Sequence, residues 1–565
     1  MSTFILNPLC HIVTPSITTK FNLNDPNNKL LFSKSNKSSS NLHLRKSSNN
    51  SSLAVKCIKE EGKVGSVNEH HQKHNLVVEN IPPPTQLPFY DLERDDFPHD
   101  FLFGASTSAL QIEGQGNEGG RGKGTWDSMI EANKGRKAVD SYNLYKEDVK
   151  LLKEMGMNTY RFSISWSRIL PNGTIRSGVN EDGINFYNYL INELIENDIT
   201  PMVTLLHFDL PQIIQDEFGG FLSPHIRELF KEYADLCFKK FGDRVKCWGT
   251  INEPLIYVYL GKKMGFPPQL QIDTEAPYIA YHNIILAHSE AAKLYKHKYQ
   301  KKQGGKIGIS LPIQWSMPFN QHDSMDLAAT EACLDLSVGW FMNPLVHGDY
   351  PEWMKNNVPG LPKFTNEEKE LVKDAYDFIG INYYSSRYIQ QSFSYDGMTG
   401  EVTISFKTQT ENVEKKNLGK PAEGRKDIYD HPNGLKQLLL HMKKKYGNPE
   451  VYVTENGISS QPTISGSIKD LIKHGKYNEL QDAFYDYDRI KYAAGHLIAV
   501  RDAIREGANV KGYVVWSLLD NMEVGSGYDV RFGLNFVDYF DNHKRYPKLS
   551  AIWLTKFLKS HIVGY

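Results

Sequence analysis

The feature that most constrains the fold is an alternation that begins near Asp96 and continues almost to the end of the chain. Short apolar runs, rich in β-branched and aromatic residues, are each followed by a longer amphipathic stretch. Near-continuous apolar runs are typical of strands covered on both faces, and therefore of a parallel sheet. Eight such runs occur, at residues 101–106, 159–166, 201–207, 245–252, 306–311, 378–383, 451–455 and 510–516.

The stretches between these runs predict helices, among them residues 142–155, 226–241, 278–299 and 482–506. Eight strands alternating with helices predict an α/β fold, a single (β/α)8 TIM barrel over residues 96–560, with long loops at the carboxyl-end face. A doubly wound open sheet is the structural rival, but no GxGxxG follows the first run. Residues 394–426 do not continue the alternation and predict a long polar loop over that face.

The N-terminal segment has a different composition from the rest of the chain. The first 59 residues contain one acidic residue, Asp25, eight lysines or arginines, and 24 serines, threonines or asparagines. Such a segment buries too little apolar surface to fold alone, and it lacks the continuous apolar core of a secretory signal. We therefore predict a plastid (chloroplast) transit peptide at residues 1–57 and a flexible linker at residues 58–95. The alternative is a solvated tail without targeting function.

Other bulk features exclude several classes of protein. A formal net charge of −1 gives no reason to expect a nucleic acid or an anionic membrane as a partner. No apolar run reaches the roughly 18 residues of a membrane-spanning helix. The five cysteines are scattered without a CxxC pair, and the histidines at positions 70, 71 and 74 have no carboxylate or thiol companions. We therefore predict neither a disulfide framework nor a metal site.

Ionisable and polar residues end many of the predicted strands, where a barrel carries its active site. Glu253 and Glu455 follow the fourth and seventh runs and are expected to face one another across the mouth. Such a pair cleaves a glycosidic bond when one carboxyl is protonated and the other is ionised. Arg161, if it reaches Glu455, would hold that group ionised and separate the two pKa values. The other polar or aromatic strand-end residues are Gln111, His207, Asn252, Tyr384, Trp516 and Glu523.

Six segments carry a resemblance to a known family. They are residues 103–114 (FGASTSALQIEG), 160–166 (YRFSISW), 252–254 (NEP), 382–384 (NYY), 454–457 (TENG) and 531–534 (RFGL). In this order they resemble glycoside hydrolase family 1 over roughly residues 88–560, and the basic leader makes the chain similar to plastid-targeted plant β-glucosidases. The resemblance implies a retaining β-glucosidase that hydrolyses a plant specialised-metabolite β-glucoside, with a saponin, terpenoid, alkaloid or phenolic aglycone. No cofactor or metal is expected, since carboxylates suffice for proton transfer and covalent catalysis.

The resemblance also implies a role for each candidate residue. Glu253, in the Asn-Glu-Pro motif, would be the general acid/base, and Glu455, in Thr-Glu-Asn-Gly, would be the nucleophile. Tyr384 and Arg161 would orient Glu455. The remaining candidates would bind the sugar: Asn252 at the 2-hydroxyl, Gln111, His207 and Glu523 at the other hydroxyls, and Trp516 beneath the ring.

The chain departs from the family's pattern on the aglycone side. Val524 follows Glu523 where most members carry tryptophan, and Phe208 replaces a second tryptophan after the third strand. The loop after the fourth strand is short, at residues 261–274, and has no cysteine. Asp427 stands where a tryptophan platform is common. Together these changes predict an aglycone side that is wider, less flatly aromatic and suited to an unusual partner.

Two other functions remain open on the sequence alone. A transglycosidase would use the same two glutamates and pass the sugar to an acceptor other than water. A non-catalytic glycoside-binding barrel is favoured only by Val524, and the retention of both glutamates argues against it. The expected partner is a small-molecule glycoside, and similar plant enzymes suggest a homo-oligomer. The glycosylation sequon at Asn172 would stay unused on a plastid route.

Overall fold

The structure is a computed structural model that describes residues 88, 90–114, 118–127, 139–264, 267, 270, 273, 275–395 and 402–560. The transit peptide predicted at residues 1–57, most of the linker predicted at residues 58–95 and the three neighbouring histidines at positions 70–74 lie outside these ranges.

Eight parallel strands close into a barrel, as predicted from the alternation. Around the barrel their order is β1-β13-β12-β7-β5-β4-β3-β2, so each strand pairs with its neighbour along the chain and the last pairs with the first. The strands are β1 (Leu102–Ser106), β2 (Thr159–Ser163), β3 (Thr200–Leu206), β4 (Cys247–Asn252), β5 (Lys306–Pro312), β7 (Phe378–Asn382), β12 (Val451–Asn456) and β13 (Val510–Trp516).

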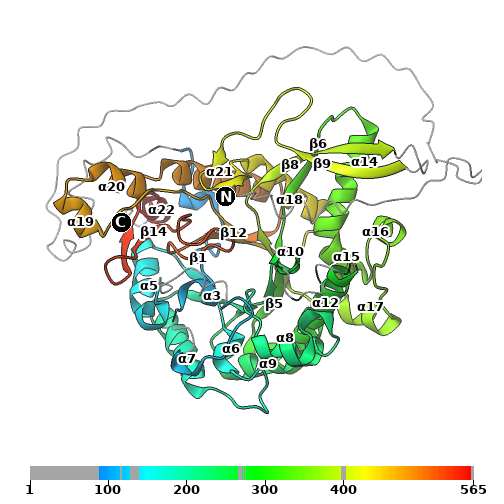
Figure 1. Cartoon of the computed structure of the whole chain (residues 1–565), viewed down its shortest axis with the longest axis horizontal. Helices are drawn as coiled ribbons and strands as arrows, with labels where there is room; N and C mark the ends of the chain where they lie inside the picture. The colour runs from blue at the N-terminus through cyan, green and yellow to red at the C-terminus, as the bar shows by residue number, and fades with distance from the viewer. Residues whose placement is uncertain are drawn as a thin grey trace, which may run out of the picture.

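The strands read as apolar runs because they are covered on both sides. Every residue of β2, β4, β7 and β12 is buried. Figure 1 shows the surrounding helices as a ring that follows the chain from α5 and α7 through α9 and α12 to α18 and α21. These are α5 (Ser141–Met155), α7 (Glu181–Glu196), α9 (Ile226–Phe241), α12 (Ala276–Leu294), α18 (Pro432–Lys445), α21 (Tyr487–Arg505) and, last in the chain, α22 (Leu549–Leu558).

The predicted helices agree with the structure at three of four places. Residues 226–241 form α9, residues 142–155 lie in α5, and residues 278–299 lie in α12 and the π-helical turn Tyr295–Gln300 that continues it. The other α-helices of the described residues are α3 (Ala109–Ile112), α6 (Trp166–Ile169), α8 (Gln212–Phe218), α10 (Pro254–Met264), α13 (Lys301–Gln303), α14 (Ser324–Leu334), α15 (Trp340–His347), α16 (Glu352–Asn357), α17 (Asn366–Val372), α19 (Ile468–Lys473) and α20 (Tyr477–Phe484).

The helix predicted at residues 482–506 is wrong in its first part. The chain forms α20, leaves the helical conformation at Tyr485 and Asp486, and starts α21 at Tyr487. The buried carboxylate of Asp486 accepts hydrogen bonds from the backbone N and the Oγ of Ser550, at 2.9 and 2.6 Å, and from Nε of Arg489 at 2.8 Å. These tertiary bonds outweigh a local helical pattern, since intrinsic propensity is only a weak preference.

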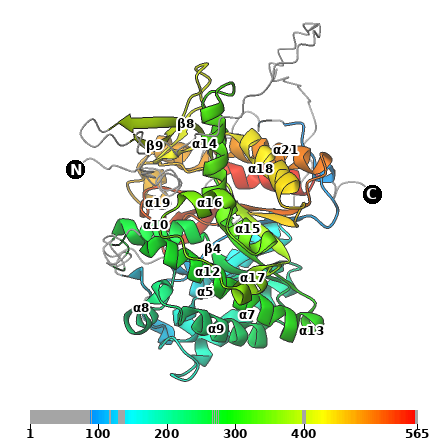
Figure 2. The same ribbon diagram turned by 90° about the vertical axis from the view of Figure 1, so that its right-hand side faces the viewer.

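The long polar loop predicted at residues 394–426 is also corrected, because much of it is β-structure. Strand β9 (Val402–Gln409) pairs antiparallel with β8 (Ser386–Tyr395), and β6 (Trp315–Pro318) completes a three-stranded sheet. This sheet projects from one end of the barrel beside α14 (Figure 2). Two smaller sheets pair β10 (Pro421–Ala422) with β11 (Arg425–Tyr429), and β14 (Asn535–Asp538) with β15 (Lys544–Pro547).

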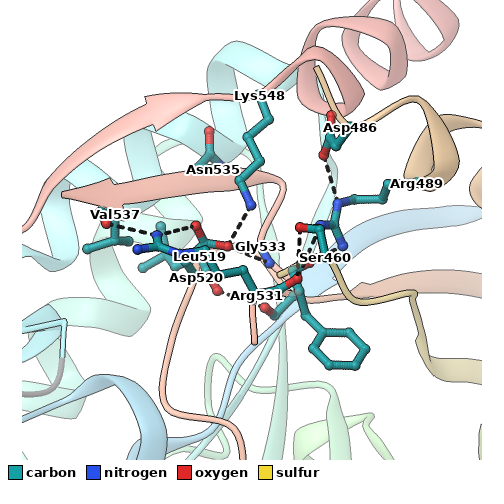
Figure 3. A network of polar contacts seen from close by, with 12 residues as sticks. Ser460, Asp486, Arg489, Leu519, Asp520, Arg531, Gly533, Asn535, Val537 and Lys548 are labelled. Carbon is teal, nitrogen blue, oxygen red and sulfur yellow. Dashed lines mark hydrogen bonds and ion pairs between the residues drawn. The ribbon is translucent and has the colours of Figure 1, made fainter. Parts of the chain in front are cut away.

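A buried ion-pair network anchors the loop between β13 and β14, which carries Glu523 (Figure 3). Asp520, in this loop, is fully buried and accepts hydrogen bonds from Nζ of Lys548 at 2.7 Å and from Nη1 of Arg531 at 2.9 Å. The backbone N of Gly533 donates a third bond to it at 3.0 Å. The network therefore ties the loop to the residue that precedes α22.

Replacing Asp520 by alanine should destabilise the fold strongly, because it leaves the buried Lys548 and Arg531 without their shared carboxylate. Removing one partner of a buried ion pair costs about 3–5 kcal/mol. The matched control is Asp541→Ala, since Asp541 pairs with Lys469 and Lys544, which are 68% and 46% exposed. The control should lose less than about 1 kcal/mol. Urea unfolding measures both changes, and equal losses would contradict a structural role of the network.

Candidate active site

A pocket opens at the carboxyl ends of the barrel strands and gathers the residues predicted for the site. Seven of the nine predicted residues line it directly, and the other two, Arg161 and Asn252, lie buried against them. The seven are Gln111, His207, Glu253, Tyr384, Glu455, Trp516 and Glu523. Residues that are far apart in the sequence thus converge because parallel strands all end at one face.

Glu253 stands at a sharp change in backbone direction. It directly follows β4, and Pro254 after it begins α10. Proline suits the first position of a helix and cannot continue a ladder of hydrogen bonds. Glu253 itself has a φ of 47°, in the left-handed region that residues other than glycine rarely adopt. Such conformations concentrate at functional sites, where the surrounding structure imposes them.

Glu455 lies within β12, and both of its carboxylate oxygens are held. Nη1 of Arg161 donates to Oε1 at 2.6 Å, and the hydroxyl of Tyr384 donates to Oε2 at 2.8 Å. Arg161 comes from β2 and is 1% exposed, so its charge is poorly screened by water. This arrangement fixes the carboxylate and favours its ionised form.

A chain of amide contacts links the two glutamates. The Nδ2 group of Asn382 donates to Oε1 of Glu253 at 2.8 Å and to Oδ1 of Asn252 at 3.1 Å. Nη2 of Arg161 donates to the same Oδ1 at 2.6 Å. Thr454 in turn donates from Oγ1 to Oδ1 of Asn382 at 2.7 Å, which fixes the orientation of that amide. Since Oε1 of Glu253 accepts an N–H, a proton on this carboxyl resides on Oε2.

The two carboxyl groups have different electrostatic surroundings. Burial, and then the charge of Glu455, raise the pKa of Glu253 to about 8. Burial also raises the pKa of Glu455, but Arg161 opposes this by its charge and hydrogen bond, and Tyr384 by its hydrogen bond. Glu253 has only an amide donor, so Glu455 is the group that ionises first. The arrangement therefore favours a carboxylic acid at Glu253 and a carboxylate at Glu455.

His207 presents a hydrogen-bond donor that has no protein partner among the described residues. Its Nε2 lies 3.1 Å from Nδ2 of Asn252, and because an amide nitrogen only donates, Nε2 is the acceptor. The ring proton is therefore on Nδ1, which is buried and makes no hydrogen bond. Burial, and secondly the charge of Arg161, hold the pKa of His207 well below its usual value, so the ring is neutral.

Gln111 connects the turn after β1 to the loop that carries Glu523. Its Nε2 donates to Oδ1 of Asn521 at 3.0 Å and to the carbonyl of Met522 at 2.7 Å. Its Oε1 accepts from the hydroxyl of Ser108 at 2.6 Å. Both N–H groups are thus occupied, and one lone pair on Oε1 remains for a bound molecule.

Trp516 ends β13 beside two other lining residues. Its indole Nε1 donates to Oε1 of Glu523 at 3.2 Å, and its ring stacks on that of His207 with the centroids 5.7 Å apart. Burial raises the pKa of Glu523 to about 8, against the opposing charge of Arg425. These three side chains form one wall with hydrogen-bonding groups beside an aromatic face.

Several residues that line the pocket were not predicted from the sequence, and two of them, Asn382 and Arg425, contact or pair with charged groups of the site. Asn382 stands in the Asn-Tyr-Tyr motif at residues 382–384 without a predicted role, although it contacts both Glu253 and Asn252. Arg425 lay in the region predicted to be a loop, but it lines the pocket from β11 and pairs with Asp427 through two hydrogen bonds. No sequence signal would have distinguished Arg425, since its position follows from the pairing of β10 with β11.

The residues that depart from the family's pattern also reach the pocket. Phe208, Val524 and Asp427 all line it. After the fourth strand, α10 extends to Met264, and most of the residues after it in the range 261–274 lie outside the described ones. Among the described residues, no group of three or more His, Cys, Asp or Glu could hold a metal, and no helix is long and apolar enough to cross a membrane.

Comparisons with known proteins give a consistent result. The model of glycosyl hydrolase family 1 matches residues 93–563. β-Glucosidase 12 of Oryza sativa subsp. japonica is 46% identical over 488 residues, which cover 83% of this chain and 93% of that protein. A furostanol glycoside 26-O-β-glucosidase of Hellenia speciosa is 43% identical, over 88% of this chain and 89% of that one. A mutant of the rice Os3BGlu6 β-glucosidase, in a covalent complex with Glc, aligns with a TM-score of 0.74 and 38% identity, over 83% of this chain and 100% of that chain.

Proposed function

Since the chain belongs to glycosyl hydrolase family 1 and is a β-glucosidase by its relatives, we propose that it cleaves a plant specialised-metabolite β-glucoside with retention of configuration. The observation that carries this proposal is the pairing of two glutamates in one pocket: the pKa of Glu253 is raised to about 8, and Glu455 is held by hydrogen bonds from Arg161 and Tyr384. The rice protein in covalent complex with Glc supports a glycosyl-enzyme intermediate, and the Hellenia protein supports a specialised-metabolite glycoside as substrate.

In the first step the ionised Glu455 attacks the anomeric carbon and forms a covalent ester with the sugar. The bond to the aglycone oxygen breaks, and the proton on Oε2 of Glu253 passes to that oxygen. Arg161 and Tyr384 keep the attacking carboxylate in place before the reaction, so little reorganisation is needed.

In the second step Glu253, now ionised, takes a proton from water while the water oxygen attacks the anomeric carbon. The ester bond breaks and Glu455 leaves as a carboxylate, so two inversions give net retention. An acceptor alcohol in place of water would make the same site a transglycosidase, because both glutamates act in the same way.

Sugar hydroxyls fit the donors and acceptors that the protein leaves unused. The free Nδ1–H of His207 would donate to one hydroxyl, and the remaining lone pair on Oε1 of Gln111 would accept from another. Nδ2 of Asn252 has one hydrogen not engaged by His207, which suits the 2-hydroxyl. Glu523 would bind further hydroxyls and Trp516 would lie beneath the ring.

The rate should fall at alkaline pH as Glu253 loses its proton. Because the pKa of Glu253 is raised to about 8, the acid form dominates at neutral pH and disappears as the pH rises through that value. We expect kcat/KM for a glucoside with a poor leaving group to fall about tenfold per pH unit above pH 8. The measurement is kcat/KM against pH, and an alkaline limb that begins near pH 5 would contradict the raised pKa.

Val524 stands at the edge of the proposed sugar subsite, and an indole there would add one hydrogen bond to a hydroxyl. A neutral hydrogen bond is worth about 0.5–1.5 kcal/mol, so Val524→Trp should improve kcat/KM for a small aryl glucoside by up to about tenfold. The native substrate should show no gain or a loss, because the larger side chain narrows the aglycone side. An unchanged aryl glucoside would mean that Val524 does not face the sugar.

We further propose that residues 1–57 direct the protein to plastids. The support is the basic, acid-poor and hydroxyl-rich composition of this segment. A reporter fused to residues 1–60 should enter plastids, whereas secretion with glycosylation at Asn172 would refute the proposal.

The experiment that tests the proposed function is a screen of plant glycosides with the purified protein and identification of the products. Release of glucose and a free aglycone from saponin, terpenoid, alkaloid or phenolic glucosides is the expected result. A parallel reaction with an added acceptor alcohol separates hydrolysis from transglycosylation. A folded protein that binds glycosides but releases nothing would instead support the non-catalytic barrel.

A further inference from the structure

The aglycone side of the pocket has two chemically different sectors. An apolar sector, defined by Phe208, Ile256, Leu260 and Val524, follows β3, β4 and β13. These residues belong to one hydrophobic cluster, in which Phe208 is buried and the others are partly buried. Three of the four are aliphatic, so the sector offers branched methyl groups more than a flat ring face.

A polar sector is defined by Gln314 after β5, Ser385 after β7, and Arg425 and Asp427 in β11. Its centre is the pair of Arg425 and Asp427, joined by hydrogen bonds of 2.9 Å from Nε and 2.8 Å from Nη2. The backbone of Asp427 is fixed as well, because Nη2 of Arg387 donates to its carbonyl oxygen at 2.6 Å. Among the described residues, Nη1 of Arg425 makes no hydrogen bond, which leaves donors for a bound molecule.

The charges of the pocket favour a neutral molecule over an anion. Arg425, which lines the pocket, and Arg161, which lies buried behind its wall, each have a carboxylate partner, Asp427 and Glu455 respectively. The other acidic residues of the pocket, Glu253 and Glu523, cannot attract an anion in either protonation state. A carboxylate that enters therefore loses its hydration without meeting an uncompensated positive charge. A hydroxyl group, by contrast, both donates and accepts, and so suits a guanidinium beside a carboxylate.

From these two sectors we infer that the leaving group is neutral and amphiphilic: a puckered aliphatic ring system packs on the apolar sector and turns its hydroxyls toward Arg425 and Asp427. This is the chemistry of hydroxylated steroidal and triterpenoid aglycones, and a planar phenol would fit only one sector well. The inference rests on the proposed function, since it names the substrate class of the same site.

Two probes separate the sectors, cyclohexyl β-glucoside and cellobiose. Their leaving groups are six-membered puckered rings that differ in carrying hydroxyls. In Arg425→Met combined with Asp427→Leu, the ratio of kcat/KM for cellobiose to that for cyclohexyl β-glucoside should fall at least about tenfold, the worth of one hydrogen bond to a charged group. In Ile256→Thr combined with Val524→Thr, the same ratio should rise at least about threefold. The cyclohexyl ring, which has no hydroxyls, loses its contacts with the removed methyl groups, so kcat/KM for cyclohexyl β-glucoside falls more than that for cellobiose.

The matched control removes an ion pair outside the pocket, by Lys150→Met and Glu154→Leu on α5, and should leave the ratio unchanged. A ratio that stays constant in both pocket variants would overturn the inference, as long as the wild-type protein still hydrolyses p-nitrophenyl β-glucoside. Absence of that hydrolysis would instead refute the proposed function.

A single conservative variant tests the charge argument with little change in the shape of the side chain. Asp427→Asn keeps the shape of the side chain and leaves Arg425 as an uncompensated cation. The preference for 3-carboxyphenyl over 3-carbamoylphenyl β-glucoside should then rise by about tenfold over wild type. If the wild-type protein already prefers the 3-carboxyphenyl glucoside, or if the variant shows no change in preference, Arg425 and Asp427 do not select a neutral leaving group.

Discussion

Replacing Glu455 by glycine should lower kcat/KM by at least about 10⁴-fold, because it removes the carboxylate that we propose to bond to the anomeric carbon. The removed side chain leaves room beside Arg161 and Tyr384, which otherwise bind its two oxygens. Azide should enter this space and restore part of the turnover with an activated β-glucoside. The product should be the α-glucosyl azide, since a single displacement inverts the anomeric carbon.

Glu450→Gly is the matched control for this variant. Glu450 immediately precedes the same strand, but it lies at the opposite end of the barrel and pairs with Lys306. The control should retain activity. If Glu455→Gly remained active without azide, or if azide gave the β-anomer, Glu455 would not be the nucleophile.

Replacing Glu253 by glutamine should affect substrates according to their leaving groups. General acid catalysis contributes about 10²–10⁴-fold, and an alkyl or steroidal glucoside with a poor leaving group should lose that factor. From a 2,4-dinitrophenyl glucoside the phenolate leaves without a proton, so the rate of the first step should fall less than about tenfold. The glutamine preserves the shape that Asn382 contacts, which keeps the network to Asn252 in place.

The pH profile gives this variant a second test. The alkaline limb near pH 8 should disappear, because no titrating acid remains at position 253. Equal losses on both classes of substrate, with the limb retained, would show that Glu253 does not supply the proton.

The barrel could be predicted from the sequence because its signal is repeated. Each of the eight apolar runs indicates a strand buried on both faces, and an error in the bounds of one run does not change the number of strands. The structure departs where a tertiary contact decides the local conformation. The helix predicted from residue 482 breaks because Asp486 binds Ser550, which lies 64 residues away. The loop prediction at residues 402–409, by contrast, overlooked a local signal, because Val402, Ile404 and Phe406 alternate with polar residues, and this segment pairs with β8 as strand β9.

The predicted site shows the same division. Glu253 and Glu455 stand in short distinctive motifs at strand ends, so their convergence followed from the barrel alone. The orientation of Glu455 by Tyr384 was expected from the family resemblance, and the structure contains that contact. Arg425 could not be predicted, because its approach to the pocket depends on a two-stranded turn and on a partner, Asp427, only two residues away.

We propose that two carboxyl groups in opposite protonation states cleave the glucoside in two displacements. Proton NMR of the anomeric signals during the first minutes of hydrolysis, before the released glucose mutarotates, distinguishes two displacements from one. The β-anomer should form first, and the α-anomer should appear only later, by mutarotation. If the α-anomer formed first, the reaction would be a single displacement by water, and Glu455 would not form a covalent intermediate.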